Sequence, residues 1–291
     1  GLAFDNTLLA LESATETLDH AWGLVGHLDS VCNSEDLRVA YNVMLPKVSE
    51  FYARIPLNEK LWQVIKAFAG TKEAGELSGV RKRFLDETLA DFRDQGADLP
   101  PEPKKRLEVL ETELAQVTQK FGENVLDATN AWDLYVDDES KLAGLPETAR
   151  ATALEDARKK GKGSEDSPVW RFTLHFPSMG PVLQYLEDET IRRQVWEASC
   201  AVGHKEPHDN TELIWKILKL RQEKAEILGK DDFADMVLER RMAKSGANAD
   251  SFVTDLHDRI LKKFSEEGQA LREYKGTDSG REVEPLKPWE T

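Results

Sequence analysis

Two histidines four residues apart are the first candidates for chemistry in this sequence. His204 and His208 enclose Glu206 in the string His-Lys-Glu-Pro-His. A zinc hydrolase of the HExxH type needs two histidines one helical turn apart, with a glutamate next to the first, so that both imidazoles and the general base face one metal. Here the glutamate stands elsewhere, and Pro207 prevents the helix that would align the imidazoles. A solvated loop is the favoured interpretation, and HExxH occurs nowhere in the chain.

The other histidines bring no second ligand pair. His257 lies beside two aspartates, and His20 follows Glu16 by one helical turn. A carboxylate-bridged site in a helical bundle needs paired Glu-x-x-His motifs, which are missing. His175 alternates with the residues of an expected strand and has no evident partner. We therefore expect no catalytic, cofactor-binding or metal-binding residue within these 291 residues.

Phosphate-binding and nucleophile motifs are also missing, since the sequence holds no GxSxG, GxxxxGK[ST] or GxGxxG. The segment Gly161-Lys162-Gly163-Ser164 lacks the spacing of a phosphate loop. The basic run 158–162 before it is typical of a last helical turn, whose cations complement the helix dipole. A flexible loop over residues 161–168 is the simpler interpretation.

The spacing of apolar residues predicts helices over most of the chain. The strongest signal covers 102–131, where apolar residues recur every three or four positions between charged ones. Pro46 is expected to kink or end a helix near Leu45. Aromatic burial in helix cores explains the seven tryptophans. The other helices are expected at about 7–28, 35–45, 58–68, 73–95, 147–159, 181–201, 210–228, 232–242 and 247–274.

A small two-stranded β element interrupts the helices. Leu134 to Val136 form a short β-like run, and residues 169–176 alternate in polarity. The fold class is therefore mostly α with a small two-stranded β insertion. We expect a helical part at 1–132 and its continuation at 133–291, with the β element within 133–177. One face of the second strand is expected to carry Trp170, Phe172, Leu174 and Phe176.

The charge balance limits the possible partners. The chain has 39 Lys and Arg against 54 Asp and Glu, a net charge of −15. This charge argues against nucleic acids and anionic membranes, which would be repelled. No apolar run approaches the ~20 residues that cross a bilayer. Cys32 and Cys200 make no CxxC or disulfide framework, so a reducing, cytoplasmic compartment is expected.

Several strings in this sequence match one known family in order. They run from the Ala-Trp-Gly-Leu-Val-Gly-His-Leu-Asp string near the start to the closing Pro-Trp-Glu. The matching segments are 21–31, 33–42, 45–50, 121–132, 144–146, 170–174, 176–179 and 288–290. Together they resemble the thimet oligopeptidase and oligopeptidase A family of zinc metallopeptidases, and their coverage of nearly the whole chain makes chance similarity improbable.

The resemblance implies a multi-helical N-terminal domain that is part of a larger, two-domain helical ellipsoid with a deep channel. Members hydrolyse short, unstructured peptides with zinc-activated water, and the HExxH motif lies in their C-terminal domain. This sequence ends at Thr291 before any such motif. The resemblance thus implies zinc in a longer parent protein and none in this chain. Its expected partners are short peptides and the missing C-terminal catalytic domain.

Three interpretations are open. The first is an inactive, channel-forming portion of a cytoplasmic zinc oligopeptidase. The second is a stand-alone helical module that binds peptides without cleaving them, which predicts a stop codon after Thr291. The third is a carboxylate-bridged metalloprotein, which the missing Glu-x-x-His pairs weaken.

Overall fold

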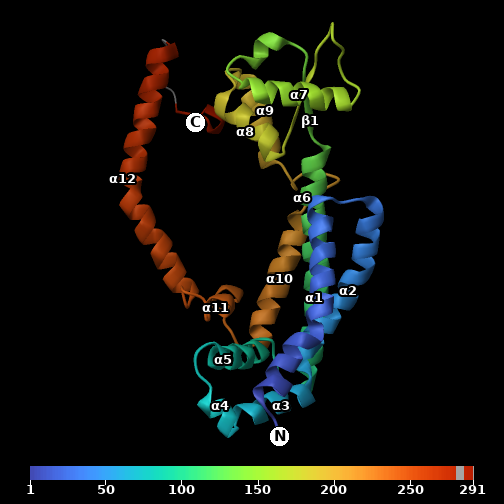
Figure 1. The fold of residues 1–291 in the computed structure, drawn as a ribbon. Coiled ribbons are helices and arrows are strands. Elements are labelled where there is room, and N and C mark those ends of the chain that lie inside the picture. The colour runs from blue at the N-terminus through green and yellow to red at the C-terminus, as the bar shows by residue number, and fades with distance from the viewer. Residues whose placement is uncertain (280–284, 291) are drawn as a thin grey trace. The chain divides into compact units, whose positions relative to one another are not determined.

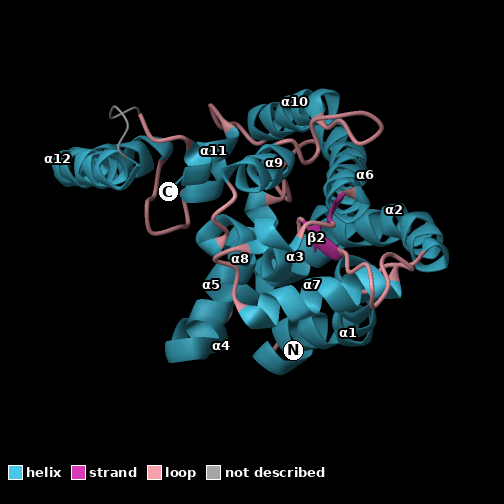
Figure 2. Ribbon diagram, turned by 90° about the horizontal axis from the view of Figure 1, so that it is seen from above, coloured by secondary structure: helices cyan, strands magenta, loops and turns pink. Residues whose placement is uncertain are grey.

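The computed structural model describes residues 1–279 and 285–290, and it is mostly helical (Figures 1 and 2). The chain forms two compact units. Unit 1 comprises residues 1–120 and 213–246, and unit 2 comprises 121–212 and 247–291. Each unit thus joins two separate stretches of sequence, and the division of the chain into domains at 1–132 and 133–291 stays a prediction. No helix in the described part is long and apolar enough to cross a bilayer.

Unit 1 is built from helices. A short π-helix, η1, leads into α1, and the short helix α11 follows α10. Helix α6 begins in unit 1 and ends in unit 2, and α10 begins in unit 2 and ends in unit 1. The elements are η1 (Asp5–Leu9), α1 (Ala10–Val31), α2 (Glu35–Leu57), α3 (Glu59–Ala69), α4 (Lys72–Glu76), α5 (Gly79–Asp94), α6 (Pro101–Ala131), α10 (Thr211–Ile227) and α11 (Phe233–Leu238).

Side-chain caps begin several of these helices. Ser34 accepts a hydrogen bond from the Leu37 amide at the start of α2, and Asn58 accepts one from the Leu61 amide at the start of α3. Each cap satisfies a backbone N–H that has no partner within the helix. The core of unit 1 packs the start of the chain on α3 and α5. It comprises Phe4, Leu8, Trp62, Ile65, Phe68, Ala74, Leu85, Phe92 and Ala97.

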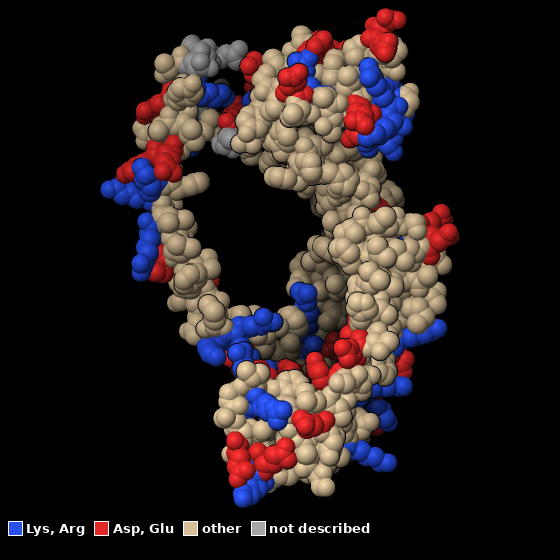
Figure 3. Space-filling view, in the orientation of Figure 1, with Lys and Arg blue, Asp and Glu red and all other residues tan. Residues whose placement is uncertain are grey.

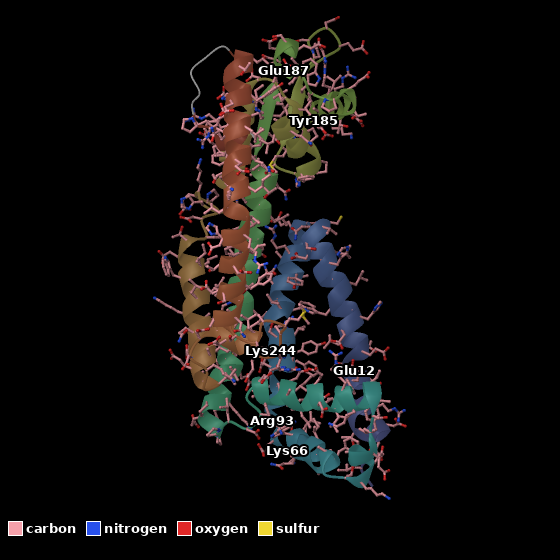
Figure 4. All side chains as sticks on the ribbon, turned by 90° about the vertical axis from the view of Figure 1, so that its left-hand side faces the viewer. Glu12, Lys66, Arg93, Tyr185, Glu187 and Lys244 are labelled. Atoms are coloured by element: carbon pink, nitrogen blue, oxygen red, sulfur yellow. The ribbon has the colours of Figure 1, made fainter. Side chains whose placement is uncertain are left out.

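Trp62 joins this core to a charged rim. Its side chain is 1% exposed and stacks on Phe92, with ring centroids 5.6 Å apart. Its indole N–H donates a hydrogen bond of 2.7 Å to Asp98. Lys66 and Arg93, labelled in Figure 4, lie 4.9 and 5.7 Å from the Trp62 ring centroid. The indole hydrogen bond is the main cause that holds the pKa of Asp98 below its usual value, and Lys66 and Arg93 add to it.

This arrangement predicts a pH dependence of stability. The pKa of Asp98 is lowered in the folded state, so its contribution is present above the unfolded value of about 4 and is lost as pH falls through the folded value. Replacing Trp62 by phenylalanine removes the donor, and we expect the pKa of Asp98 to rise toward its usual value. Carboxyl-carbon NMR titration measures this shift. Trp215→Phe on α10 is the control, and an unchanged Asp98 titration in Trp62→Phe would contradict the assignment.

Arg240, in the segment after α11, forms ion pairs with carboxylates of α5. Its guanidinium donates to Glu87, Asp91 and Asp94, with 3.0 Å to the Asp94 oxygen. The three carboxylates lie on successive turns of α5, so one cation neutralises the repulsion among them. The same contacts raise the pKa of Arg240.

The described part of unit 2 contains the sheet, the α-helices α7, α8, α9 and α12 and the short 3-10 helices η2 and η3, together with the end of α6 and the start of α10. Strands β1 and β2 pair antiparallel, with Leu134 opposite Phe172 and Val136 opposite Trp170. Arg171 of β2 donates through Nη2 at 2.6 Å and Nε at 2.8 Å to one carboxylate oxygen, Oδ1, of Asp133 on β1. The elements are β1 (Asp133–Val136), η2 (Glu139–Leu142), α7 (Glu147–Lys159), β2 (Trp170–Thr173), α8 (Phe176–Tyr185), α9 (Glu189–Cys200), α12 (Gly246–Ser279) and η3 (Pro288–Glu290).

The core of unit 2 lies where the sheet, α7, α8 and α9 meet. Alternation along β2 directs Trp170 and Phe172 into it, with 4% and 2% of their surfaces exposed. Apolar burial of this kind is the main stabilising contribution in a small core. The other buried members are Val136, Leu142, Leu145, Ala153, Val182, Leu186, Ile191 and Val195.

Several helices differ from the sequence expectations. Pro46 does not end α2, because one missing N–H does not prevent the following turns from forming. The expected helix 73–95 is two helices, since Ser78 is extended and Gly79 has φ +54°. The expected helix 181–201 is also two, because Asp188 caps a new helix by accepting from the Ile191 amide. Helix α11 ends at Leu238, earlier than residue 242.

Two aromatic expectations are corrected as well. Phe176 is 77% exposed, because the chain leaves β2 after Thr173 and starts α8. Trp215 is 58% exposed and does not belong to a core. Near the end of the chain, Trp289 contacts Trp196 and Arg193 of α9. Glu284 and Thr291 at that end lie outside the described residues.

Candidate functional site

A groove in unit 2 lies where the C-terminal ends of α6 and α9 meet the end of β2 and the loop after α9. Its cavity holds about 270 Å³. Alanines on the last turns of both helices leave this space open, since larger side chains there would fill it. The apolar lining consists of Ala128, Ala131, Trp132, Leu174, Ala198, Ala201 and Val202.

The rim of the groove is polar and comes from the loop after α9. Lys205, Glu206, Pro207 and His208 line it. Lys205 and Glu206 are exposed, and His208 is half-buried. Within residues 1–279 and 285–290, none of these three charged or titratable side chains has a hydrogen-bond or ion-pair partner. The rim therefore offers one cation, one carboxylate and one imidazole to a ligand.

Buried hydrogen bonds fix this loop on α6. Asn210 is 2% exposed, and its side-chain oxygen accepts a 2.8 Å bond from the Asn124 amide. Its own amide donates to the Phe121 carbonyl at 3.2 Å, and its backbone N–H donates to the Gly203 carbonyl at 2.9 Å. Gly203 has φ +70°, and a Cβ there would lie 3.0 Å from the Asn210 amide nitrogen. The buried amide pair therefore stabilises the conformation of this loop.

Asp209, next to His208, does not line the groove and instead forms hydrogen bonds within the loop. Its carboxylate accepts bonds from the Thr211 hydroxyl at 2.7 Å and the Thr211 amide at 2.9 Å. These bonds hold the pKa of Asp209 below its usual value, with a smaller contribution from His204. Its charge therefore caps the start of α10.

Replacing Asn210 by alanine should destabilise unit 2. The change leaves the buried Asn124 amide and the Phe121 carbonyl without their partner, and each lost buried bond costs about 1–3 kcal/mol. We expect the free energy of unfolding to fall by about 2–3 kcal/mol in urea denaturation. Asn130→Ala, at an exposed position near the end of α6, should change it by less than about 0.5 kcal/mol. Equal effects of the two changes would show that the amide pair does not hold the loop.

The structure brings only one of the sequence-highlighted histidines, His208, into the lining of the groove. His204 is exposed on the same loop but does not line the cavity. His20 is exposed on α1, His175 is exposed at the start of α8, and His257 contacts Asp258 at 3.1 Å on α12. Over the described residues, no three His, Cys, Asp or Glu side chains are placed to hold a metal ion. The donor set required for structural or catalytic zinc is thus not met in this part.

Internal hydrogen bonds close the glycine-rich segment after α7 into a turn. The Ser164 amide donates to the Ser167 carbonyl at 2.9 Å, and the Ser167 amide donates to the Ser164 hydroxyl at 3.1 Å. Gly161 and Gly163 have φ +69° and +78°. The Ser164 and Ser167 amides are therefore used within the turn.

Unit 1 has a second cavity of about 270 Å³ between α1, α2 and α5. Its apolar wall includes Leu8, Ile55 and Phe92, and Glu12 lies at its edge (Figure 4). Its other carboxylate, Asp91, is already bound by Arg240.

Known sequence motifs do not reveal this groove, because small and apolar residues form most of its lining. One signal was present in the sequence: alanines three residues apart near two helix ends, at 128 and 131 and at 198 and 201. Such pairs lie on one helix face. Only the packing of α6 and α9 in the folded chain brings the two faces together.

Two family models match the chain in order. The model described as the N-terminal domain of neurolysin and thimet oligopeptidase matches residues 3–104, and the model of peptidase family M3 matches residues 182–291. The two matches cover the N-terminal and C-terminal parts of the chain. Their order agrees with that of the strings that resemble the family.

Curated relatives match over nearly the full chain. Oligopeptidase A of Haemophilus influenzae is 32% identical over 99% of this chain and 42% of the relative. Oligopeptidase A of Escherichia coli is 31% identical with the same coverage, and the probable cytosolic oligopeptidase A of Arabidopsis thaliana is 28% identical over 96% of this chain and 40% of its own length. The chain spans about two fifths of the length of these relatives. It belongs to the oligopeptidase A and thimet oligopeptidase family of peptidases and matches the N-terminal portion of that family.

Proposed function

We propose that this chain is part of a longer, zinc-dependent oligopeptidase that hydrolyses short, unstructured peptides in the cytoplasm. The observation that carries the proposal is the match to oligopeptidase A over 99% of the chain and 42% of the relative. In this proposal the zinc ligands lie outside residues 1–291, because the sequence contains no HExxH motif. When bound, zinc would activate the attacking water.

The role proposed for this chain is to form one wall of a deep channel. Such a wall admits extended peptides and excludes folded proteins by size. The exposed apolar stripe of α12 supports a place within a larger molecule, since large apolar patches on a free surface are rare. The space-filling view shows mainly uncharged atoms along much of α12 (Figure 3). The stripe comprises Phe252, Val253, Leu256, Ile260, Leu261, Phe264, Leu271 and Tyr274, each at least 45% exposed.

The test compares the longer protein with the 291-residue chain. We expect the longer protein to cleave a short quenched peptide, to lose this activity with a chelator and to regain it with zinc. A folded protein that contains a sequence similar to that of the peptide should resist cleavage. The 291-residue chain alone should cleave neither. Zinc-dependent cleavage by the chain alone would overturn its inactivity, and no cleavage by the longer protein would overturn the proposed function.

A second candidate is a stand-alone module that binds peptides without hydrolysis. The groove of unit 2, with its unpaired rim side chains, favours this candidate over a purely structural role. The two candidates differ in the reading frame after Thr291: a frame that reaches HExxH supports the oligopeptidase, and a stop codon supports the module.

The proposed partners are short peptides and a C-terminal catalytic domain, with neither nucleic acids nor membranes among them. The net charge of −15 supports the exclusion of polyanions. Acidic and basic side chains are interspersed on the visible face in Figure 3. Cys32 and Cys200 are both free and exposed, which supports a reducing compartment.

A further inference from the structure

We propose that the groove between the ends of α6 and α9 binds the C-terminal end of a peptide, with an apolar last side chain in the cavity and the terminal carboxylate on Lys205. The inference rests on the proposed function for its ligand class, since it takes peptides as the molecules this chain meets. It adds a specific site, a specific end of the peptide and a side-chain preference.

The size and lining of the cavity select the side chain. A dry apolar cavity of roughly 150 Å³ is enough for benzene. The groove holds about 270 Å³, so it accommodates one aromatic or large aliphatic side chain together with part of its backbone. Trp132 supplies an aromatic wall, and the alanines on the two helix ends supply close apolar contact. A charged side chain would lose its hydration against this lining.

The charges at the rim select the end of the peptide. Lys205 is exposed and unpaired in the described part of the chain, so its ammonium is free to bind a carboxylate. Glu206 next to it accepts hydrogen bonds, and the backbone N–H groups that precede a peptide's last residue donate them. Asp209 is engaged with Thr211 and adds no free acceptor. A carboxylate on the same Cα as an apolar side chain, preceded by backbone N–H donors, is found at a peptide's C-terminal end.

The site is preorganised, which lowers the cost of binding. The loop that carries Lys205 and Glu206 is fixed by the buried Asn124 and Asn210 pair and by the turn at Gly203. A ligand therefore does not have to order the loop. The cavity walls come from helix ends and not from long flexible side chains.

Binding to the 291-residue chain tests the proposal directly. The probe is the acetylated peptide Gly-Gly-Ala-Phe with a free C-terminal carboxylate, measured by calorimetry and NMR. Its C-terminal amide should bind about three to ten times more weakly, because it lacks the charge. A peptide ending in glycine should bind at least about ten times more weakly, because the cavity stays unfilled.

Variants locate the site. Ala198→Leu and, from the opposite wall, Ala131→Leu fill the cavity and should abolish binding. Ala151→Leu, at an exposed position of α7, is the matched control. Lys205→Ala should weaken the free acid to the level of the amide and leave the amide unchanged. Lys141→Ala, an exposed lysine on η2, should change neither.

The outcomes separate this inference from the proposed function. Equal binding of acid and amide overturns the role of Lys205, and binding that survives both cavity-filling variants overturns the site. Absence of binding to a folded chain, checked by circular dichroism, overturns the whole inference. None of these measurements uses zinc or cleavage, so the activity of the longer protein is decided separately.

Discussion

Replacing Gly144 by alanine is expected to lower the free energy of unfolding of unit 2 by about 4 kcal/mol. Gly144 has φ +82°, and a Cβ there would lie 2.2 Å from the Tyr185 carbonyl oxygen and 3.0 Å from Cγ of Glu187. Tyr185 and Glu187 are labelled in Figure 4. The closest contact of the new methyl group is with a backbone atom, the Tyr185 carbonyl oxygen, so the turn or the end of α8 has to move.

That backbone is held from two sides. The Glu187 amide donates to the Ala143 carbonyl at 2.9 Å. Arg192 donates to the Leu186 and Glu187 carbonyls, with 3.0 Å to the latter, and to the Trp289 carbonyl at 2.8 Å. Movement of residues 185–187 would therefore break several bonds at once, which is why the expected effect is large.

Gly161→Ala is the matched control for this change. Gly161 has φ +69°, and no atom lies within 4 Å of an added Cβ. Its substitution therefore costs only the left-handed backbone conformation, about 1 kcal/mol. Urea denaturation followed by circular dichroism measures both variants. A Gly144→Ala variant as stable as Gly161→Ala would show that the close approach to Tyr185 is absent.

Truncating Trp62 to alanine has the second large effect, a loss of about 3–5 kcal/mol in the unfolding of unit 1. The change removes a side chain that is 1% exposed and leaves a cavity against Phe92. It also removes the hydrogen bond to Asp98 and the ring that Lys66 contacts. Thermal unfolding should show a correspondingly lower midpoint for the variant.

Trp215→Ala controls for tryptophan removal. Trp215 is 58% exposed on α10, so its truncation should change the free energy of unfolding by less than about 1 kcal/mol. Trp62→Phe should lie between the two, because it keeps most of the apolar contact and loses the indole donor. Similar losses for Trp62→Ala and Trp215→Ala would place Trp62 outside the core.

Helix positions were largely readable from the sequence. The expected 102–131 corresponds to α6 at Pro101–Ala131, and the expected 147–159 corresponds to α7 with the same bounds. Ser34 and Asn58, which cap α2 and α3, are residue types that favour the N-cap position. These features depend on residues a few positions apart, so local periodicity and capping determine them.

The breaks within expected helices were not readable in the same way. Leu77 and Leu186 both fit a helical apolar pattern, yet the chain is extended at each. Leu186 is 2% exposed in the core of unit 2, and Arg192 binds its carbonyl. Burial in the core and the bond from Arg192 stabilise the extended conformation at Leu186. A local apolar pattern does not contain these tertiary interactions.

The sequence by itself determined the family, the mostly helical class, the two-stranded insertion and the absence of an HExxH motif, because each depends on the order and local spacing of residues. Only the tertiary structure decided that the ends of α6 and α9 enclose a groove and that Trp289 packs on α9. It also decided that Asn210 is buried against Asn124 across 86 positions of sequence. These features arise from packing between distant segments, whose contacts depend on how whole elements meet and not on the residues beside them.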